Sequence, residues 1–257
     1  MLKSITDTFT LEDNPCWECP TCHQQTLTII KEALYERPDS SSGKRIAYDH
    51  SKGRESHPYE LTGGVFTAML RCVSPSCNES VACSGTLSYD VDYNEDWSSN
   101  LNERHVIRYN PKMFVPPLHP FLIPDECDIR IINPLMSSFS LLPSSPSSAA
   151  NNLRIAVERF MDVLGVSNKE KLHQRIELLE QTDPSKAHLI MSIKWLGNSG
   201  SHEYETVNTG DVITGYTVFK HLLDKLYPAK LVDNSEALAD ELHLKFDAKY
   251  AKRCKKG

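Results

Sequence analysis

Residues 192–202 read Ser-Ile-Lys-Trp-Leu-Gly-Asn-Ser-Gly-Ser-His, and the rest of the chain is organised around this stretch. It follows a helical pattern, contains Gly197 and Gly200, and ends in a polar cluster. Glycine costs a helix interior about 1 kcal/mol relative to alanine, and Asn and Ser compete with the helix for backbone hydrogen bonds. This composition beside a helix end indicates a turn, a close helix contact or a functional site, and all three interpretations stay open.

The C-terminal part of the chain, residues 149–257, predicts helices because apolar residues recur there at spacings of three and four. Gly165, Gly197 and Pro228 are expected to end the first, third and fourth helices. Short connections between helices of this length favour an antiparallel helical bundle. The five expected helices begin after Ser147 or Ser148, near Lys169, at Asp183, near Thr209 and at Ser235.

The N-terminal part contains two groups of closely spaced cysteines: Cys16, Cys19 and Cys22, then Cys72, Cys77 and Cys83. Zinc binds four soft ligands in a tetrahedron, and two short loops that contain Pro and Ser supply such a set. The best set of ligands for a structural Zn²⁺ ion is Cys19, Cys22, Cys72 and Cys77. Cys16 is an alternative to Cys19, and Cys83, Cys127 and Cys254 are expected to stay free.

Strand-like runs flank these cysteines at residues 26–34, 65–71 and 80–89. Strands that flank two cysteine loops are typical of a zinc ribbon, which we expect over residues 1–96. The interval 37–60 has little periodicity and is expected to form a long loop. Residues 97–148 are rich in Pro and Ser and are expected to form an extended linker that packs on the helices. The predicted fold class is therefore α+β.

The overall composition excludes some classes of function. The formal net charge is −6, so no global positive field attracts the chain to nucleic acid or membranes. No apolar run reaches the length of a membrane span, and the first residues have no signal-peptide core, so we expect a cytoplasmic protein without a membrane partner. Cysteines in such a protein indicate metal binding or free thiols before disulfides.

Arg154 and Glu158 lie four residues apart on the first expected helix and therefore on one face. Either the two side chains form a surface ion pair, or one of them reaches into the bundle toward the polar cluster that ends at His202. Their spacing alone does not separate these two interpretations.

The motif Leu-Arg-x-Ala-x-Glu at residues 153–158, followed by Gly-Asn-x-x-x-His at residues 197–202, resembles the prokaryotic domain-of-unknown-function family 4145. The resemblance covers about residues 124–227, and members of that family often carry an N-terminal zinc ribbon with similar cysteine loops. It implies a HEPN-like helical bundle. Such bundles frequently dimerise and include RNases and toxins of prokaryotic defence systems.

The resemblance and the zinc motif together predict an interaction module. It would bind nucleic acid or a partner protein, act as a homodimer, and serve anti-phage (antiviral) defence or nucleic-acid metabolism. In this interpretation the polar stretch is structural: Gly197 permits close helix packing, Asn198 caps a turn, and His202 bonds a backbone carbonyl. Whether the chain is an enzyme stays open.

The alternative is a HEPN-type, metal-independent endoribonuclease. In HEPN RNases an Arg-x(4–6)-His motif holds the scissile phosphate, whereas this chain has Lys194 at the position of the arginine and a longer interval before His202. His202 would act as the acid or base, since imidazole titrates near neutral pH. Lys194 or Arg154 would neutralise the phosphate, Asn198 would orient it, and Glu158 would support Arg154.

Overall fold

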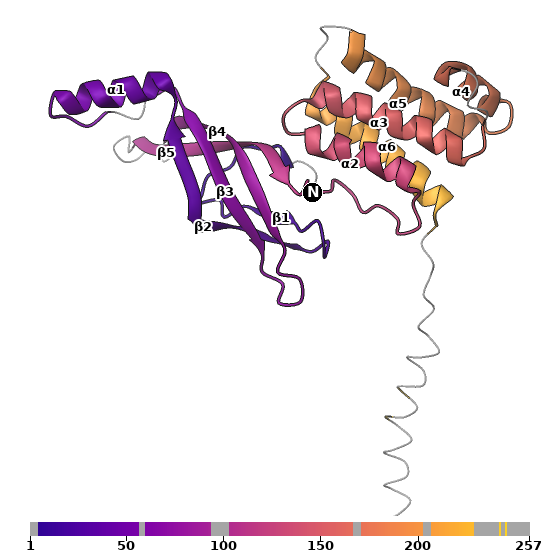
Figure 1. Ribbon diagram of the computed structural model, residues 1–257, viewed down its shortest axis with the longest axis horizontal. Helices are drawn as coiled ribbons and strands as arrows, with labels where there is room; N and C mark the ends of the chain where they lie inside the picture. The colour runs from indigo at the N-terminus through magenta and orange to yellow at the C-terminus, as the bar shows by residue number, and fades with distance from the viewer. Residues whose placement is uncertain are drawn as a thin grey trace, which may run out of the picture.

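The computed structural model describes residues 5–56, 60–93, 103–166, 171–202 and 207–228, together with Leu242 and Lys245. An antiparallel sheet is followed by helices, so the predicted α+β class is confirmed (Figure 1). The strands are β1 (Cys16–Glu18), β2 (Gln25–Pro38), β3 (Gly64–Cys72), β4 (Ser80–Tyr93) and β5 (Glu103–Val115). The helices are α1 (Ser40–Ser51), α2 (Ile129–Leu141), α3 (Pro146–Val163), α4 (Leu172–Glu180), α5 (Pro184–His202) and α6 (Thr209–Leu226).

The sheet has the strand order β1-β2-β3-β4-β5, and each strand is antiparallel to its neighbours. Strict alternation along β3 buries Phe66, Ala68 and Leu70 and exposes the residues between them. The sheet curls around this buried side (Figure 1). Phe9 stacks on Tyr109 with ring centroids 5.2 Å apart and closes the apolar core there.

Helix α1 lies where the sequence predicted a long loop over residues 37–60, so that prediction is wrong. The Asp39 carboxylate caps the helix by accepting a hydrogen bond from the Ser42 backbone N–H at 2.7 Å. Further along, Asp49 is fully buried and is bound by Arg45 and Arg54. Polar contacts rather than an apolar stripe hold α1, and hydrophobic periodicity therefore missed it.

The predicted linker over residues 97–148 is also corrected, because it contains β5 and α2. Pro111 fits within β5 because this is an edge strand with an irregular register opposite Gly85, where a missing N–H costs little. Pro134 lies inside α2. Within the described part of this predicted linker, residues 116–128 and 142–145 have no regular strand or helix.

Helices α2 to α6 contribute to one apolar core that includes Leu135, Phe160 and Phe219. The start and end of α6 agree with the predicted fourth helix, and α4 agrees closely with the second. Helix α3 begins at Pro146, just before the expected cap at Ser147 or Ser148. The predicted fifth helix falls almost entirely outside the described residues. Among the described helices, none combines the length and apolar composition needed to cross a membrane.

Helix α5 continues through residues 192–202, so the predicted helix end at Gly197 is wrong. Its glycines lie where α5 meets α3. A Cβ atom at Gly197 would lie 2.5 Å from the Arg154 Cβ, and one at Gly200 would lie 2.6 Å from the Ser147 carbonyl oxygen. Close helix packing is therefore what this stretch provides, and Asn198 lies within the helix instead of capping a turn.

Residues 116–128 connect the sheet to the helices through side chains that belong to both cores. Leu118 is buried in the core of the sheet, and Phe121 is buried in the core of the helices. Between them, the His119 ring lies 5.8 Å from that of His23 and 5.9 Å from that of Phe139, centroid to centroid. This short segment therefore packs the two parts of the chain against each other.

We expect Gly197→Ala to lower the free energy of unfolding by about 1–3 kcal/mol, because the new methyl group overlaps α3. Chemical denaturation of the full chain measures this change. Gly43→Ala in α1 is the matched control, since a Cβ there meets nothing within 4 Å. The control is expected to be neutral or slightly stabilising. Equal effects of the two substitutions would contradict the packing role of Gly197.

Acid is expected to destabilise the contact at His119. Burial, with repulsion from His23, lowers the pKa of His119 from 6.5 to about 4. Between these values the unfolded chain binds more protons than the folded one, so the free energy of unfolding falls as the pH falls. When the pH falls from 7 to 5, the free energy of unfolding is expected to fall by about 1–2 kcal/mol less in His119→Gln than in the wild type. This difference is reduced to allow for the partial solvent exposure of His119. Urea unfolding of both proteins at pH 7 and pH 5 measures this difference. An equal loss of stability in the wild type and in His119→Gln would contradict the prediction.

Candidate functional site

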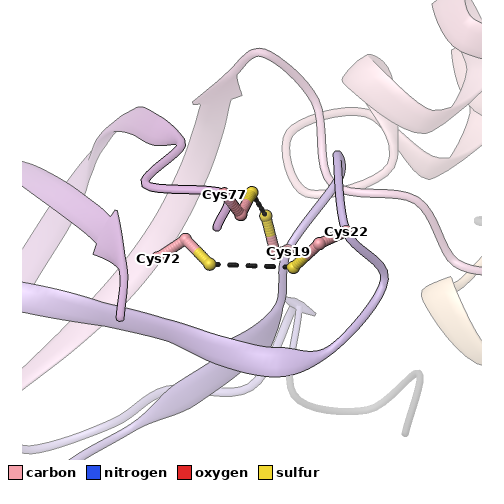
Figure 2. Close-up of side chains that lie close together, drawn as sticks. All are labelled: Cys19, Cys22, Cys72 and Cys77. Carbon is pink, nitrogen blue, oxygen red and sulfur yellow. Dashed lines mark hydrogen bonds between the residues drawn. The ribbon is translucent and has the colours of Figure 1, made fainter. Parts of the chain in front are cut away.

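Four cysteine side chains converge between the two hairpin loops of the sheet (Figure 2). The sulfur atoms of Cys19, Cys22, Cys72 and Cys77 all lie within 4.8 Å of one another. The Sγ atoms of Cys19 and Cys77 are 3.7 Å apart, as are those of Cys22 and Cys72. Four thiolates at about 2.3 Å from a central ion in a tetrahedron would lie about 3.8 Å from one another. The arrangement therefore suits a metal ion bound by four cysteines.

Two similar turns aim these thiols at one point. In the β1–β2 loop, the backbone N–H of His23 donates to the Cys19 carbonyl at 3.0 Å. In the β3–β4 loop, the backbone N–H of Asn78 donates to the Ser74 carbonyl at 3.1 Å. His23 and Asn78 each follow the second cysteine of their loop and have φ values of 56° and 55°. Asn and His adopt this left-handed region more readily than most residues, so the sequence supports both turns.

Hydroxyl groups hold the two loops together and orient one ligand. Thr21 in the first loop donates to the Glu79 carboxylate beside the second loop at 2.5 Å. The Thr26 Oγ1 atom lies 3.0 Å from the Cys72 Sγ atom, and the backbone N–H of Val73 donates to the Thr26 carbonyl. Such outer contacts fix the direction of metal ligands. Thr21 lies within the first cysteine loop and Glu79 just after the second, but their sequence positions gave no sign that they contact each other. Thr26 likewise belongs to no motif that indicates its contact with Cys72.

The protonation of the thiols also favours metal binding. Burial raises the pKa of Cys72, but hydrogen bonds from the Thr26 hydroxyl and the Ser74 backbone outweigh burial and lower it to about 6. A hydrogen bond from the Glu79 backbone lowers the pKa of Cys77, but burial and the other three thiols outweigh that bond and raise it to about 12. One thiol therefore ionises readily, whereas the full set needs a cation to offset the repulsion among thiolates.

The other cysteines that the structure describes are not members of this cluster. Cys16, the predicted alternative to Cys19, instead donates from its thiol to the Gln25 carbonyl at 3.2 Å. Cys83 and Cys127 are buried, and burial raises the pKa of their thiols to about 12 and about 11. No described cysteine forms a disulfide, and Cys254 lies outside the described residues.

The predicted catalytic residues are only partly brought together. Arg154 and Glu158 form an ion pair, with both side chains about one quarter exposed. Lys194, Asn198 and His202 recur every four residues along α5 and therefore share one helix face. Asn198 is exposed, and the Lys194 Nζ atom lies 5.7 Å from the centroid of the Trp195 ring. The side chain of His202 lies outside the described residues.

Two pockets border this region. One of about 410 Å³ opens between α5 and α6 and is lined by Ser199, Asp211 and Gly215 among others. Another of about 480 Å³ lies between α3 and α4 and includes Arg154 and Glu158. The sequence motifs did not indicate the second pocket, because most of its charged residues follow no recognised spacing.

Comparison with known families divides the chain as the fold does. A model of the domain of unknown function DUF4145 matches residues 137–253. The C-terminal part is similar to DUF4145 domains. This finding confirms that part of the resemblance seen in the sequence. A second domain of unknown function, DUF8608, matches residues 7–114 and so covers nearly all of the sheet. No curated protein and no solved structure matches the chain.

Metal content tests the cysteine cluster. We expect about one metal ion per chain by elemental mass spectrometry, because a site of four thiolates binds one ion. Cys72→Ser is expected to lose most of this metal, because it removes one thiolate ligand. Cys16→Ser is the matched control and should retain the metal, since Cys16 faces a backbone carbonyl instead of the cluster. Loss of metal in both variants, or in neither, would contradict this assignment.

Proposed function

We propose that this protein is a zinc-stabilised module that binds single-stranded nucleic acid on its sheet. Four thiolates select a soft ion such as Zn²⁺ over Mg²⁺ or Ca²⁺. Protein ligands would fill every position of the tetrahedron and leave none for water or substrate, which is the pattern of structural zinc. The metal would thus stabilise a zinc-ribbon-like sheet, and catalysis at the metal is not part of the proposal.

The exposed side of the sheet carries the binding role, and we define this outer face by four rows of paired residues. The alternation along β3 points Val65, Thr67, Met69 and Arg71 to this side. Each row runs across neighbouring strands. The four rows are Thr28–Arg71–Ser80, Met69–Ala82–Val115, Tyr35–Thr67–Ser84–Met113 and Arg37–Val65–Thr86–Asn110.

This outer face combines an exposed aromatic ring, apolar side chains and positive charge. Tyr35 is 68% exposed and Met113 is 48% exposed, although both lie within strands of the sheet. Arg37 and Arg71 are exposed at opposite ends of the rows, and none of the residues paired in these rows is Asp or Glu. The face is thus cationic in a chain of net charge −6. Stacking surfaces flanked by cations are typical of single-strand binding.

The proposal includes a HEPN-like bundle for α2 to α6. Their common apolar core and the short connection between α2 and α3 support a bundle. A homodimer, a role in defence, a protein partner and a cytoplasmic location stay predictions from the sequence.

Tyr35→Ala is expected to weaken binding of labelled single-stranded RNA or DNA by about tenfold, because it removes one stacking platform. Fluorescence anisotropy measures the dissociation constant, with the same salt concentration for all proteins because binding to nucleic acid depends on salt. Tyr48→Ala is the matched control, because Tyr48 is 55% exposed on α1, outside the four rows. An unchanged affinity in Tyr35→Ala, or the same loss in both variants, would remove the outer face as the binding site.

The second candidate function is the HEPN-type ribonuclease, and the shared helix face of Lys194, Asn198 and His202 favours it. Incubation of RNA with the wild type and with His202→Ala, both in buffer without added divalent metal ions, separates the candidates. Under the binding proposal neither protein cleaves RNA. Cleavage by the wild type that His202→Ala abolishes would establish the ribonuclease instead.

A further inference from the structure

The pocket between α3 and α4 is unusually rich in positive charge. Four of its lining residues are cationic and two are anionic. The cations are Arg154, Arg159, Lys171 and Arg175, and the anions are Glu158 and Asp162. Each anion already pairs with arginine: Glu158 with Arg154, and Asp162 with both Arg159 and Arg175. The lining thus keeps an excess of two positive charges after these pairs are formed.

Arg175 supplies the second, independent observation. Its side chain is only 6% exposed, which is rare for a charged group. It donates to the Asp162 carboxylate at 2.7 Å and to the Val166 carbonyl at 3.2 Å, and a longer contact of 3.5 Å reaches the Glu158 carbonyl. Its buried Nε atom has no hydrogen-bond partner among the described residues. A buried guanidinium with an unused donor is stabilised by an anion placed beside it.

The N-terminus of α4 adds to this preference. Lys171 is the N-cap residue, and both Lys171 and Leu172 line the pocket. The first turn of α4 contains no acidic residue that would offset the positive end of the helix dipole. The backbone N–H of Lys171 already donates to the Gln174 side chain at 3.2 Å, so the preference for an anion at this end rests on the helix dipole.

We propose that this pocket binds a phosphomonoester. A dianionic phosphate would neutralise the excess of two positive charges and accept hydrogen bonds from Lys171 and the exposed Arg159. At about 480 Å³ the pocket is larger than a phosphate group, so it also admits part of the molecule to which the phosphate is attached. A mononucleotide and the 5′-phosphate end of an RNA strand share this chemistry. The site is separate from the outer face of the sheet.

Binding is tested on the full chain by calorimetry with adenosine 5′-monophosphate and with adenosine. Two short RNA strands of one sequence, one with a 5′-phosphate and one with a 5′-hydroxyl, form the second arm. The proposal predicts that the phosphorylated member of at least one pair binds more than tenfold more tightly than its partner. Preference in the first pair alone identifies a mononucleotide site, and preference in the second alone identifies an RNA-end site. No preference in either pair overturns the proposal.

Lys171→Gln is expected to weaken binding of the preferred phosphorylated probe by about tenfold, since it removes a charge-assisted contact. Lys220→Gln is the matched control, because Lys220 pairs with Asp224 on α6, outside this pocket. Arg175→Lys is less suitable as the main variant because Arg175 also ties α4 to α3. Thermal unfolding of each variant checks that the fold is intact. Equal losses in Lys171→Gln and Lys220→Gln, or none in Lys171→Gln, would overturn the assignment.

The nucleic-acid site on the sheet and the phosphate site between α3 and α4 can be tested independently of each other. Tyr35→Ala on the sheet is expected to leave the affinity for adenosine 5′-monophosphate unchanged, since Tyr35 lies on β2 and the pocket lies between α3 and α4. Loss of that affinity in Tyr35→Ala would contradict a site confined to the helices.

Discussion

The convergence of four thiols on one point is the constraint on which the sheet depends. Cys19 and Cys22 lie in the loop before β2, whereas Cys72 and Cys77 lie in the loop between β3 and β4. An ion held by all four would join the two loops across the long segment that contains β2, α1 and β3. Closing a segment of this length costs the unfolded chain conformational entropy, which metal coordination would offset. The same ion would also remove the repulsion among the four thiolates.

The effect of this cluster extends to the helices. His23 directly follows Cys22, and its ring lies against His119, which in turn lies against Phe139 of α2. Leu118 and Phe121 on either side of His119 are buried in different cores. The position of the first cysteine loop is therefore coupled to the packing of α2. Two parts that match separate domain families are thus joined by a short segment that buries side chains in both cores rather than by a free linker.

Sequence reasoning succeeded where local spacing determines structure. The two cysteine loops were predicted because thiols three and five residues apart converge only in tight turns, and α6 was predicted because its apolar residues follow a helical period. It failed where polar contacts decide. The buried Asp49 holds α1 through ion pairs with Arg45 and Arg54, and Thr26 contacts Cys72 from another strand. It also failed at α5, because a glycine read as a helix end serves as a contact point between helices.

The contact between Gly197 of α5 and Arg154 of α3 links the packing of the helices to the charge of the pocket between α3 and α4. Gly197 leaves room for the Cβ and Cδ atoms of Arg154, whose guanidinium pairs with Glu158 in the charged pocket. A larger residue on α5 would displace the stem of this arginine and, with it, the charge at the wall of the pocket. A substitution at position 197 therefore changes helix spacing and pocket electrostatics at once.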